Sequence, residues 1–263
     1  YNKIKGNFES LTVDGKEILD KPIDVNIWRA PTDNDRKLKL EWFRAGYDRV
    51  ATRAYDTEYQ VEENKVVIRT TSSLAAKALQ KVIDMDTTWE VTNGGEIHFK
   101  MNVKKDMEFP ELPRFGLRLF LKNEFENVSY YGVGPEESYV DKCRCGCHSL
   151  YNANVVDLYE DYIKPQENGS HVDCDYITLA SKDLVFAAVS QKTFSFNASV
   201  YTQEELTEKK HNFELEASGS TVLCLDYAQN GIGSNSCGPV LKQEYKLNEE
   251  SFTFEMKMLF QKL

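Results

Sequence analysis

The sequence has no long apolar run and no surplus of basic residues, and these deficits exclude several classes of protein. Its longest uninterrupted apolar stretch is the six residues from Leu184 to Val189, whereas a membrane-spanning helix needs about 20. Lys and Arg number 32 against 42 Asp and Glu, a formal net charge of −10. Nucleic acids and anionic membranes bind basic faces, so we predict no nucleic-acid partner and no membrane partner. A neutral ligand is compatible with this charge.

Cysteine is also too scarce for a disulfide-built scaffold, with six residues in a chain of 263. Three of them form the segment Cys143-Arg-Cys145-Gly-Cys147-His148, which has the composition of a metal site. Zinc ligand pairs are usually separated by about two to four residues, whereas alternate cysteines place three thiols on one face of a strand. We therefore expect reduced thiols and no metal ligands here, with structural zinc as the alternative.

The chain lacks a charged, apolar leader and begins at Tyr1 rather than at Met. We expect a processed chain or a piece excised from a longer one. No linker rich in Pro, Gly or Ser divides the sequence, so residues 1–263 are predicted to form a single domain.

Apolar residues alternate with polar ones throughout, which predicts half-buried antiparallel strands. The clearest alternating segments are 97–103, 115–121, 194–200 and 252–258. Asn93-Gly94-Gly95 and Asp14-Gly15 have the composition of tight hairpin turns. The fold class predicted is all-β, a large antiparallel sandwich.

Signals for helices are few. The segment from Leu38 to Tyr47 predicts a short amphipathic helix, and Thr202 with Glu205 has the spacing of a capping box. A third helix is expected from Gly134, with Glu136 and Glu137 as acids in its first turn.

Four loops depart from the strand pattern and are the candidates for function: residues 26–36, 132–141, 159–170 and 229–239. The first contains Asp33-Asn34-Asp35, whose donors and acceptors suit sugar hydroxyls or an Asx turn that caps the next helix. The third mixes tyrosines with amides and acids, as a sugar site or a structured loop does. The fourth is rich in glycine, yet it is no phosphate-binding fingerprint and carries no Ser-His-Asp triad.

Taken in order, these loops resemble one family closely. The resemblance rests on Trp28-Arg-Ala-Pro-Thr-Asp-Asn-Asp35, Tyr131-Gly-Val-Gly-Pro-Glu-Glu-Ser-Tyr139-Val-Asp141, Tyr162-Ile-Lys-Pro-Gln-Glu-Asn-Gly169 and Gly231-Ile-Gly-Ser-Asn-Ser-Cys-Gly-Pro239. Together they are similar to the C-terminal domain (small-chain type) of bacterial β-galactosidases of glycoside hydrolase family 2, and the similarity covers nearly the whole chain.

The resemblance implies a β-supersandwich like that of galactose mutarotases, within a longer, cytoplasmic glycosidase that hydrolyses terminal β-D-galactose residues. The acid/base and nucleophile glutamates would lie in a (β/α)₈ barrel outside this sequence, so no catalytic residue is expected here. The family often uses Mg²⁺ and Na⁺, again outside this segment, which itself is expected to hold no cofactor. The implied partners are a β-galactoside, the barrel and other domains, and a second copy of the chain in a homo-oligomer.

We expect the loops at 26–36, 159–170 and 229–239 to converge on one rim and to line the sugar pocket. The pocket candidates are Asp33, Asn34, Glu167, Asn168 and Cys237. Cys237 stands where the best-known member of the family has a tryptophan that stacks on the substrate, and a thiol offers no such surface. Tyr227 or a residue of the barrel is the candidate replacement.

Two other functions remain open from the residues alone. The first is a free-standing aldose mutarotase or epimerase, which needs an acid and a base beside the sugar, with His148 and His171 as candidates. The second is a lectin-like or structural interaction domain.

Overall fold

The computed structural model describes residues 1–233 and 236–263, and strands dominate it. Its strands are β1 (Thr12–Val13), β2 (Lys16–Glu17), β3 (Leu19–Asn26), β4 (Val50–Val61), β5 (Lys65–Ala76), β6 (Lys81–Thr92), β7 (Glu96–Lys105), β8 (Arg114–Lys122), β9 (Asn127–Gly134), β10 (Cys147–Asn154), β11 (Ser170–Ala180), β12 (Leu184–Ser199), β13 (Ser220–Gln229) and β14 (Ser251–Lys262). The helices are α1 (Leu38–Ala45) and α2 (Gln203–Glu208), with short 3-10 helices at Asp33–Arg36, Tyr47–Arg49, Val155–Leu158, Asn212–Glu214 and Gln243–Tyr245.

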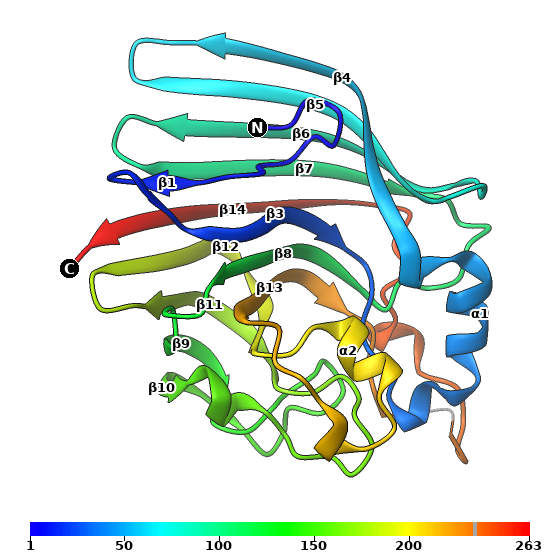
Figure 1. Cartoon of the computed structure of the whole chain (residues 1–263). Helices are drawn as coiled ribbons and strands as arrows, with labels where there is room; N and C mark the ends of the chain where they lie inside the picture. The colour runs from blue at the N-terminus through cyan, green and yellow to red at the C-terminus, as the bar shows by residue number, and fades with distance from the viewer. Residues whose placement is uncertain (234–235) are drawn as a thin grey trace.

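Apart from the small β1–β2 hairpin, all strands belong to one antiparallel sheet. Its main path runs β10-β9-β11-β12-β14-β7-β6-β5-β4, and β13 leaves this path at β12 to pair with β8, which pairs with β3. Figure 1 shows β4 to β7 and β14 side by side, with α1 at one end of the molecule and the β11–β12 turn at the other. The predicted all-β, antiparallel fold is confirmed. Neither α1 nor α2 has the length and apolar character of a membrane-spanning helix.

The core lies between the β3-β8-β13 branch and the long strands of the main path. The ring of Phe115 on β8 packs edge-on against Phe252 on β14, with centroids 4.9 Å apart. A second aromatic series links Trp89, Phe99 and Phe254, each ring 5.1 Å from the next. Alternation correctly predicts β7 and β14: over residues 97–104 and 252–258 the apolar positions are buried while the intervening polar ones are not.

The strand β8 differs from the half-buried strand that was expected. Arg114 to Leu121 are all buried, on both faces of the strand. The apolar side of β8 packs in the core, while loops and α2 cover its other side; Arg118, for example, reaches Glu204 of α2 at 2.8 Å. An alternating pattern of apolar and polar residues indicates that one face of a strand is buried. It therefore does not reveal that β8 is buried on both faces.

Turn chemistry fixes the hairpins as the sequence predicted. Asp14 and Gly15 have φ of 51° and 80° between β1 and β2, and Gly95 has φ of 83° between β6 and β7. The two helices α1 and α2 also form where expected, and the Thr202 hydroxyl accepts from the Glu205 amide at 3.1 Å.

Two local expectations are wrong. Residues 135–136 form a bend and residues 137–138 are irregular, so no helix forms here, because Glu137 is turned inward to bind other loops. The alternate cysteines do not share a strand face, since Cys143 and Cys145 lie in a loop and only Cys147 belongs to β10.

Gly116 provides a test of the β8–β13 pairing. It lies opposite Asp226, and a Cβ built there would collide with the backbone carbonyl of Leu225 and with the Asp226 side chain. We predict that Gly116→Ala lowers the free energy of unfolding in urea by about 1–3 kcal/mol, since the strands must separate locally. Gly94→Ala is the control, because its Cβ would meet only Thr92 Oγ1 at 3.7 Å. Equal unfolding midpoints for the two variants would contradict this.

Candidate functional site

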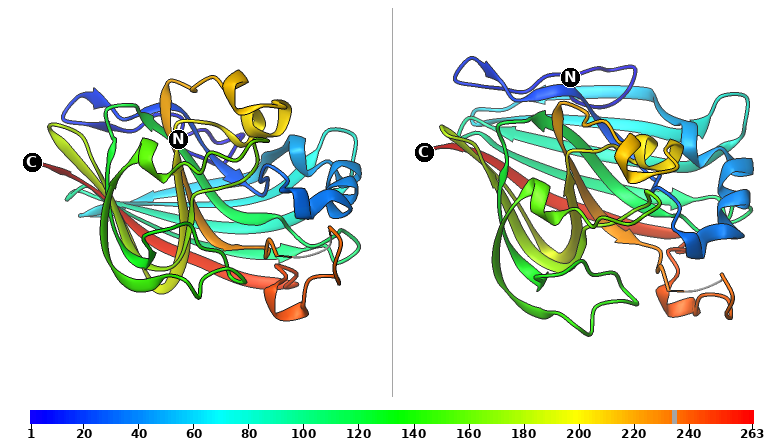
Figure 2. Two further views of the ribbon diagram at one scale, coloured as in Figure 1. Left: turned by 90° about the horizontal axis from the view of Figure 1, so that it is seen from below. Right: turned by 60° about the horizontal axis from the view of Figure 1, so that its bottom comes forward.

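The loops singled out by sequence meet at one end of the sheet. The Glu167 amide donates to the Ala30 carbonyl at 2.9 Å, and Asn34 Nδ2 donates to the Ile232 carbonyl at 2.7 Å. These bonds join residues 26–36, 159–170 and the described parts of 229–239, so the convergence expected of these loops is confirmed; residues 234 and 235 of the last loop lie outside the described residues. Both views of Figure 2 place α1 and the segment after β13 at this same end.

The fourth loop joins the same assembly. The Asp141 carboxylate accepts from the amides of Ile232, at 3.0 Å, and Gly233, at 2.7 Å. We refer to residues 26–36, 132–141, 159–170, 229–233 and 236–239 together as the loop cluster. Its members come from four separate parts of the chain, and hydrogen bonds fix each to at least one other.

A buried arginine holds the first and last of these loops together. Arg29 is fully buried, and its guanidinium binds Asp35 through Nη2 at 2.7 Å and Nε at 3.2 Å. The same group donates to the carbonyls of Asn230 and Gly231, and it lies over the Trp42 ring of α1, 5.3 Å from the centroid. One side chain therefore anchors a 3-10 turn, a helix and the chain after β13.

A second buried arginine fixes the third loop to the sheet. Arg114 Nη1 lies 2.6 Å from Glu167 Oε1, and its Nη2 lies 2.5 Å from Asp226 Oδ2. The other oxygen of Glu167 accepts from the Ala30 amide at 3.1 Å. We call Arg29, Asp35, Arg114, Glu167 and Asp226 the ion cluster.

Electrostatics explain why the ion cluster holds together. Burial alone would lower the pKa of Arg114, but Asp226 and Glu167 raise it well above its usual value, so the guanidinium stays charged. Burial raises the pKa of Glu167, against the opposing effect of Arg114. Both Glu167 oxygens are occupied and the residue is only 3 % exposed, so it cannot act as a free acid on a bound sugar.

Glu137 plays a similar positioning role in the second loop. Its carboxylate accepts from the Gly169 amide at 2.9 Å and from the hydroxyls of Tyr139 and Tyr162, and it pairs with Lys142 at 2.5 Å. These contacts tie residues 132–141 to residues 159–170. The inward direction of this side chain explains why no helix begins here.

The five predicted pocket residues divide into two groups. Asp33 is at the surface, with its side chain 70 % exposed and 3.5 Å from Lys164, and Cys237 is exposed as well. Asn34 is partly buried. Glu167 and Asn168 are buried, and Asn168 binds the Glu160 amide and the Gln166 carbonyl. Asp33, Cys237 and the partly buried Asn34 remain candidates for sugar contact, whereas the buried Glu167 and Asn168 position the loops.

Tyr227, the candidate replacement for the stacking tryptophan, does not lie on the loop cluster. Its ring stacks on Phe252 of β14, with centroids 4.4 Å apart, and its hydroxyl donates to Glu249. The ring lines a different cavity, which is described below.

Sequence reasoning missed the arginines and Asp226. One signal was available for Asp226, because it directly follows the apolar run Val222–Leu225 within a strand. A charge in a buried strand requires an opposite charge nearby, although the sequence alone does not say which one.

The described residues contain no group of three or more His, Cys, Asp or Glu side chains placed to hold a metal ion. Cys145 and Cys147 are exposed, and none of the six cysteines forms a disulfide in the structure.

The two histidines considered for epimerase chemistry differ in access. His148 is partly exposed and lies 3.1 Å from Asp175. His171 is 1 % exposed, donates from Nδ1 to the Val133 carbonyl at 3.2 Å, and packs between Tyr130 and Phe196. Such a buried ring cannot touch a substrate.

Comparison with known proteins gives a consistent result. A family model described as "Beta galactosidase small chain" matches residues 1–258. A β-galactosidase of Actinobacillus pleuropneumoniae is 45 % identical over 99 % of this chain and 26 % of its own length. For a β-galactosidase of Staphylococcus xylosus the identity is 38 %, with the same coverage. The chain thus spans about a quarter of the length of these relatives.

Among solved structures, a galactose 1-epimerase from Lactobacillus acidophilus covers 79 % of this chain at a TM-score of 0.42 and 9 % identity. That match covers 66 % of the epimerase.

The burial of His171 predicts a pH dependence of stability. Burial lowers its pKa from 6.5 to about 4, so between these values the unfolded chain binds a proton that the folded chain does not. Stability should therefore fall as the pH is lowered from 6.5 to 4, by up to ~3 kcal/mol from this residue.

Urea denaturation at several pH values measures this contribution. His171→Asn should remove that part of the pH dependence, whereas His211→Asn should keep it, because the His211 side chain is 54 % exposed. Identical pH profiles for the wild type and His171→Asn would refute the assignment.

Proposed function

The chain belongs to the β-galactosidase small chain family, and on that premise we propose that it is the non-catalytic part of a β-galactosidase. In this proposal the loop cluster completes a sugar pocket whose catalytic residues lie in another domain. The parent enzyme would hydrolyse terminal β-D-galactose residues.

The observation that carries the proposal is that hydrogen bonds and buried ion pairs join four loops at one end of the sheet. Loops that are held by buried charges present a fixed surface, and a fixed surface is what a pocket assembled from two domains requires. The surface offers polar groups, among them the exposed Asp33 carboxylate.

Exposed apolar side chains on and beside the loop cluster support contact with another domain. Ile163 is 89 % exposed and Val240 is 68 % exposed. Both lie in or next to loops that also carry the candidate sugar contacts. Covering them with a neighbouring domain would remove apolar surface from water.

The three buried acids of the loop cluster support a non-catalytic role. Glycosidases use two carboxyl groups on either side of the scissile bond. Asp35 and Glu167 are committed to buried arginines, and Glu137 is committed to Lys142, two tyrosines and an amide. In this proposal the catalytic pair comes from residues outside this segment, with a (β/α)₈ barrel as its source.

The remaining partners follow from the same proposal. A β-galactoside is the proposed sugar, and the barrel, other domains of the parent chain and a second copy are the proposed protein partners. Mg²⁺ and Na⁺ would bind at sites of the parent outside this segment. The proposed location is the cytoplasm.

The first test uses the 263-residue chain alone. Without a carboxylate pair it should fold but not hydrolyse an aryl β-galactoside, because neither leaving-group protonation nor nucleophilic attack is available. Product release is followed by absorbance against a blank. Turnover that persists through purification to homogeneity would overturn the proposal.

The second test uses the full-length enzyme that contains this segment. Asp33→Ala and Asn34→Ala should each lower kcat/KM for the aryl β-galactoside roughly three- to tenfold. The reason is that each variant removes about one hydrogen bond between the loop cluster and the sugar. Thermal unfolding checks that the variants keep their stability.

Asp183→Ala is the matched control for this second test. Asp183 is exposed in the β11–β12 turn, at the other end of the molecule (Figure 1). Unchanged kinetics in both test variants, or equal losses in the control, would show that the loop cluster makes no contact with the sugar.

A further inference from the structure

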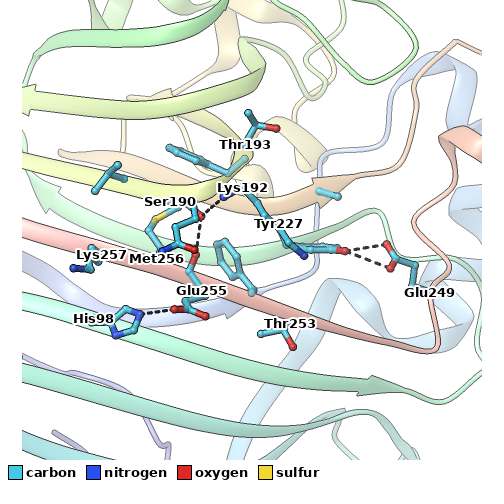
Figure 3. A pocket seen from close by; sticks show the side chains of 15 residues that line it. His98, Ser190, Lys192, Thr193, Tyr227, Glu249, Thr253, Glu255, Met256 and Lys257 are labelled. Carbon is cyan, nitrogen blue, oxygen red and sulfur yellow. Dashed lines mark hydrogen bonds and ion pairs between the residues drawn. The ribbon is translucent and has the colours of Figure 1, made fainter.

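The sheet divides at β12, and a cavity lies at the division that no residue of the loop cluster lines. Residues Leu184 to Val189 of β12 pair with β14, and residues Ser195 to Ser199 pair with β13. The five residues between these segments cross from one partner to the other. They leave a cavity of about 530 Å³ bordered by β12, β13 and β14 (Figure 3). We call it the fork cavity.

A β-bulge directs Tyr227 into the fork cavity. Asp226 pairs with Gly116 and Ala228 with Phe115, so Tyr227 is an extra residue on β13. Bulges redirect side chains in this way. Asp226 consequently binds the buried Arg114, while Tyr227 lines the cavity.

The Tyr227 ring is held as a rigid platform. One face stacks on Phe252 at an interplanar angle of 14°, and the hydroxyl donates to both Glu249 oxygens, at 3.1 and 3.3 Å. Burial raises the pKa of Tyr227 to about 12, so the hydroxyl remains a neutral donor. Figure 3 shows the ring and Glu249 at one side of the cavity.

Polar groups of both kinds border the remaining sides. His98 Nε2 lies 2.9 Å from Glu255 Oε1, and Lys192 and Lys257 also line the cavity. Two lysines and two glutamates, Glu249 and Glu255, line the cavity, so their formal charges cancel. The balance disfavours phosphate-bearing ligands and isolated cations, and it suits a neutral ligand with many hydroxyl groups.

An incoming peptide strand fits the fork less well than a small ligand does. The Ser190 hydroxyl donates to the Glu255 carbonyl at 2.9 Å and so occupies an acceptor that an added strand would use. This bond bridges β12 and β14 where the two strands separate, and the cavity of about 530 Å³ beside it is of small-molecule size.

We propose that the fork cavity is a carbohydrate-binding site, separate from the loop cluster, in which the apolar face of a pyranose ring packs on Tyr227. Glu249, Glu255 and His98 would bind its hydroxyl groups. The combination of an aromatic face with balanced donors and acceptors is the chemistry that neutral sugars require. The site needs no second domain, and its existence does not depend on the function proposed for the loop cluster.

The experiment is a titration of the ¹⁵N-labelled 263-residue chain with D-galactose, D-glucose and lactose, followed by amide chemical shifts. At least one sugar should shift the amides of Lys192, Thr193 and Ala228, with weak affinity. Tyr227→Ala should raise the Kd of that sugar roughly three- to tenfold. Tyr227→Phe, which keeps the ring, should change the Kd less.

Matched controls separate binding from folding. Tyr59→Ala removes a tyrosine that is 62 % exposed on β4 and should leave the Kd unchanged. Glu249→Ala removes an exposed carboxylate that also accepts from the Tyr227 hydroxyl and should weaken binding about threefold, whereas Glu250→Ala, its exposed neighbour outside the cavity, should not. If Tyr227→Ala fails to fold, the comparison of Kd between Glu249→Ala and Glu250→Ala tests the proposal instead.

Three results would overturn the proposal. One is the absence of shifts with all three sugars at 100-fold molar excess and above, up to ~100 mM. Another is a set of shifts confined to the loop cluster, which would support the proposed function and not this site. The third is an equal Kd for Glu249→Ala and Glu250→Ala.

Discussion

Two buried guanidinium groups determine how the functional end of this molecule is built. Arg29 and Arg114 are both fully buried, and a buried charge is tolerated only with partners at close range. Their partners lie on loops and strands that are distant in sequence; Arg114 and Asp226, for instance, are 112 residues apart. Removing one partner of such a pair typically costs about 3–5 kcal/mol, so the loops keep one arrangement.

Strand β13 contributes side chains to two separate surfaces, the loop cluster and the fork cavity. At the end of β13 a bulge turns Asp226 toward Arg114 and Tyr227 toward the fork cavity. Gly116 permits the close approach that seats Asp226 beside β8. The strand thus serves the loop cluster on one side and borders the fork cavity on the other. The sheet divides at β12 because the first part of this strand pairs with β14 and its last part pairs with β13.

The sequence predicts well where one face is apolar and a turn residue is explicit, as in β7, β14 and the turn at Asp14-Gly15. It predicts the convergence of loops, because segments that break the strand pattern gather at the ends of a sandwich. It fails at Glu137, which starts no helix, and at β8, which is buried on both faces. Both failures come from long-range contacts that no local pattern encodes.

The claim that buried guanidinium groups fix the loops is tested most directly by amide hydrogen exchange in Arg29→Met. This variant loses the bonds to Asp35, Asn230 and Gly231. Exchange at Glu167, Ile232 and Gly233, whose amides bind across the loops, should accelerate by about tenfold or more, while β5 and β6 keep their protection. Unchanged exchange in the loops, or an equal acceleration in β5 and β6, would contradict the account.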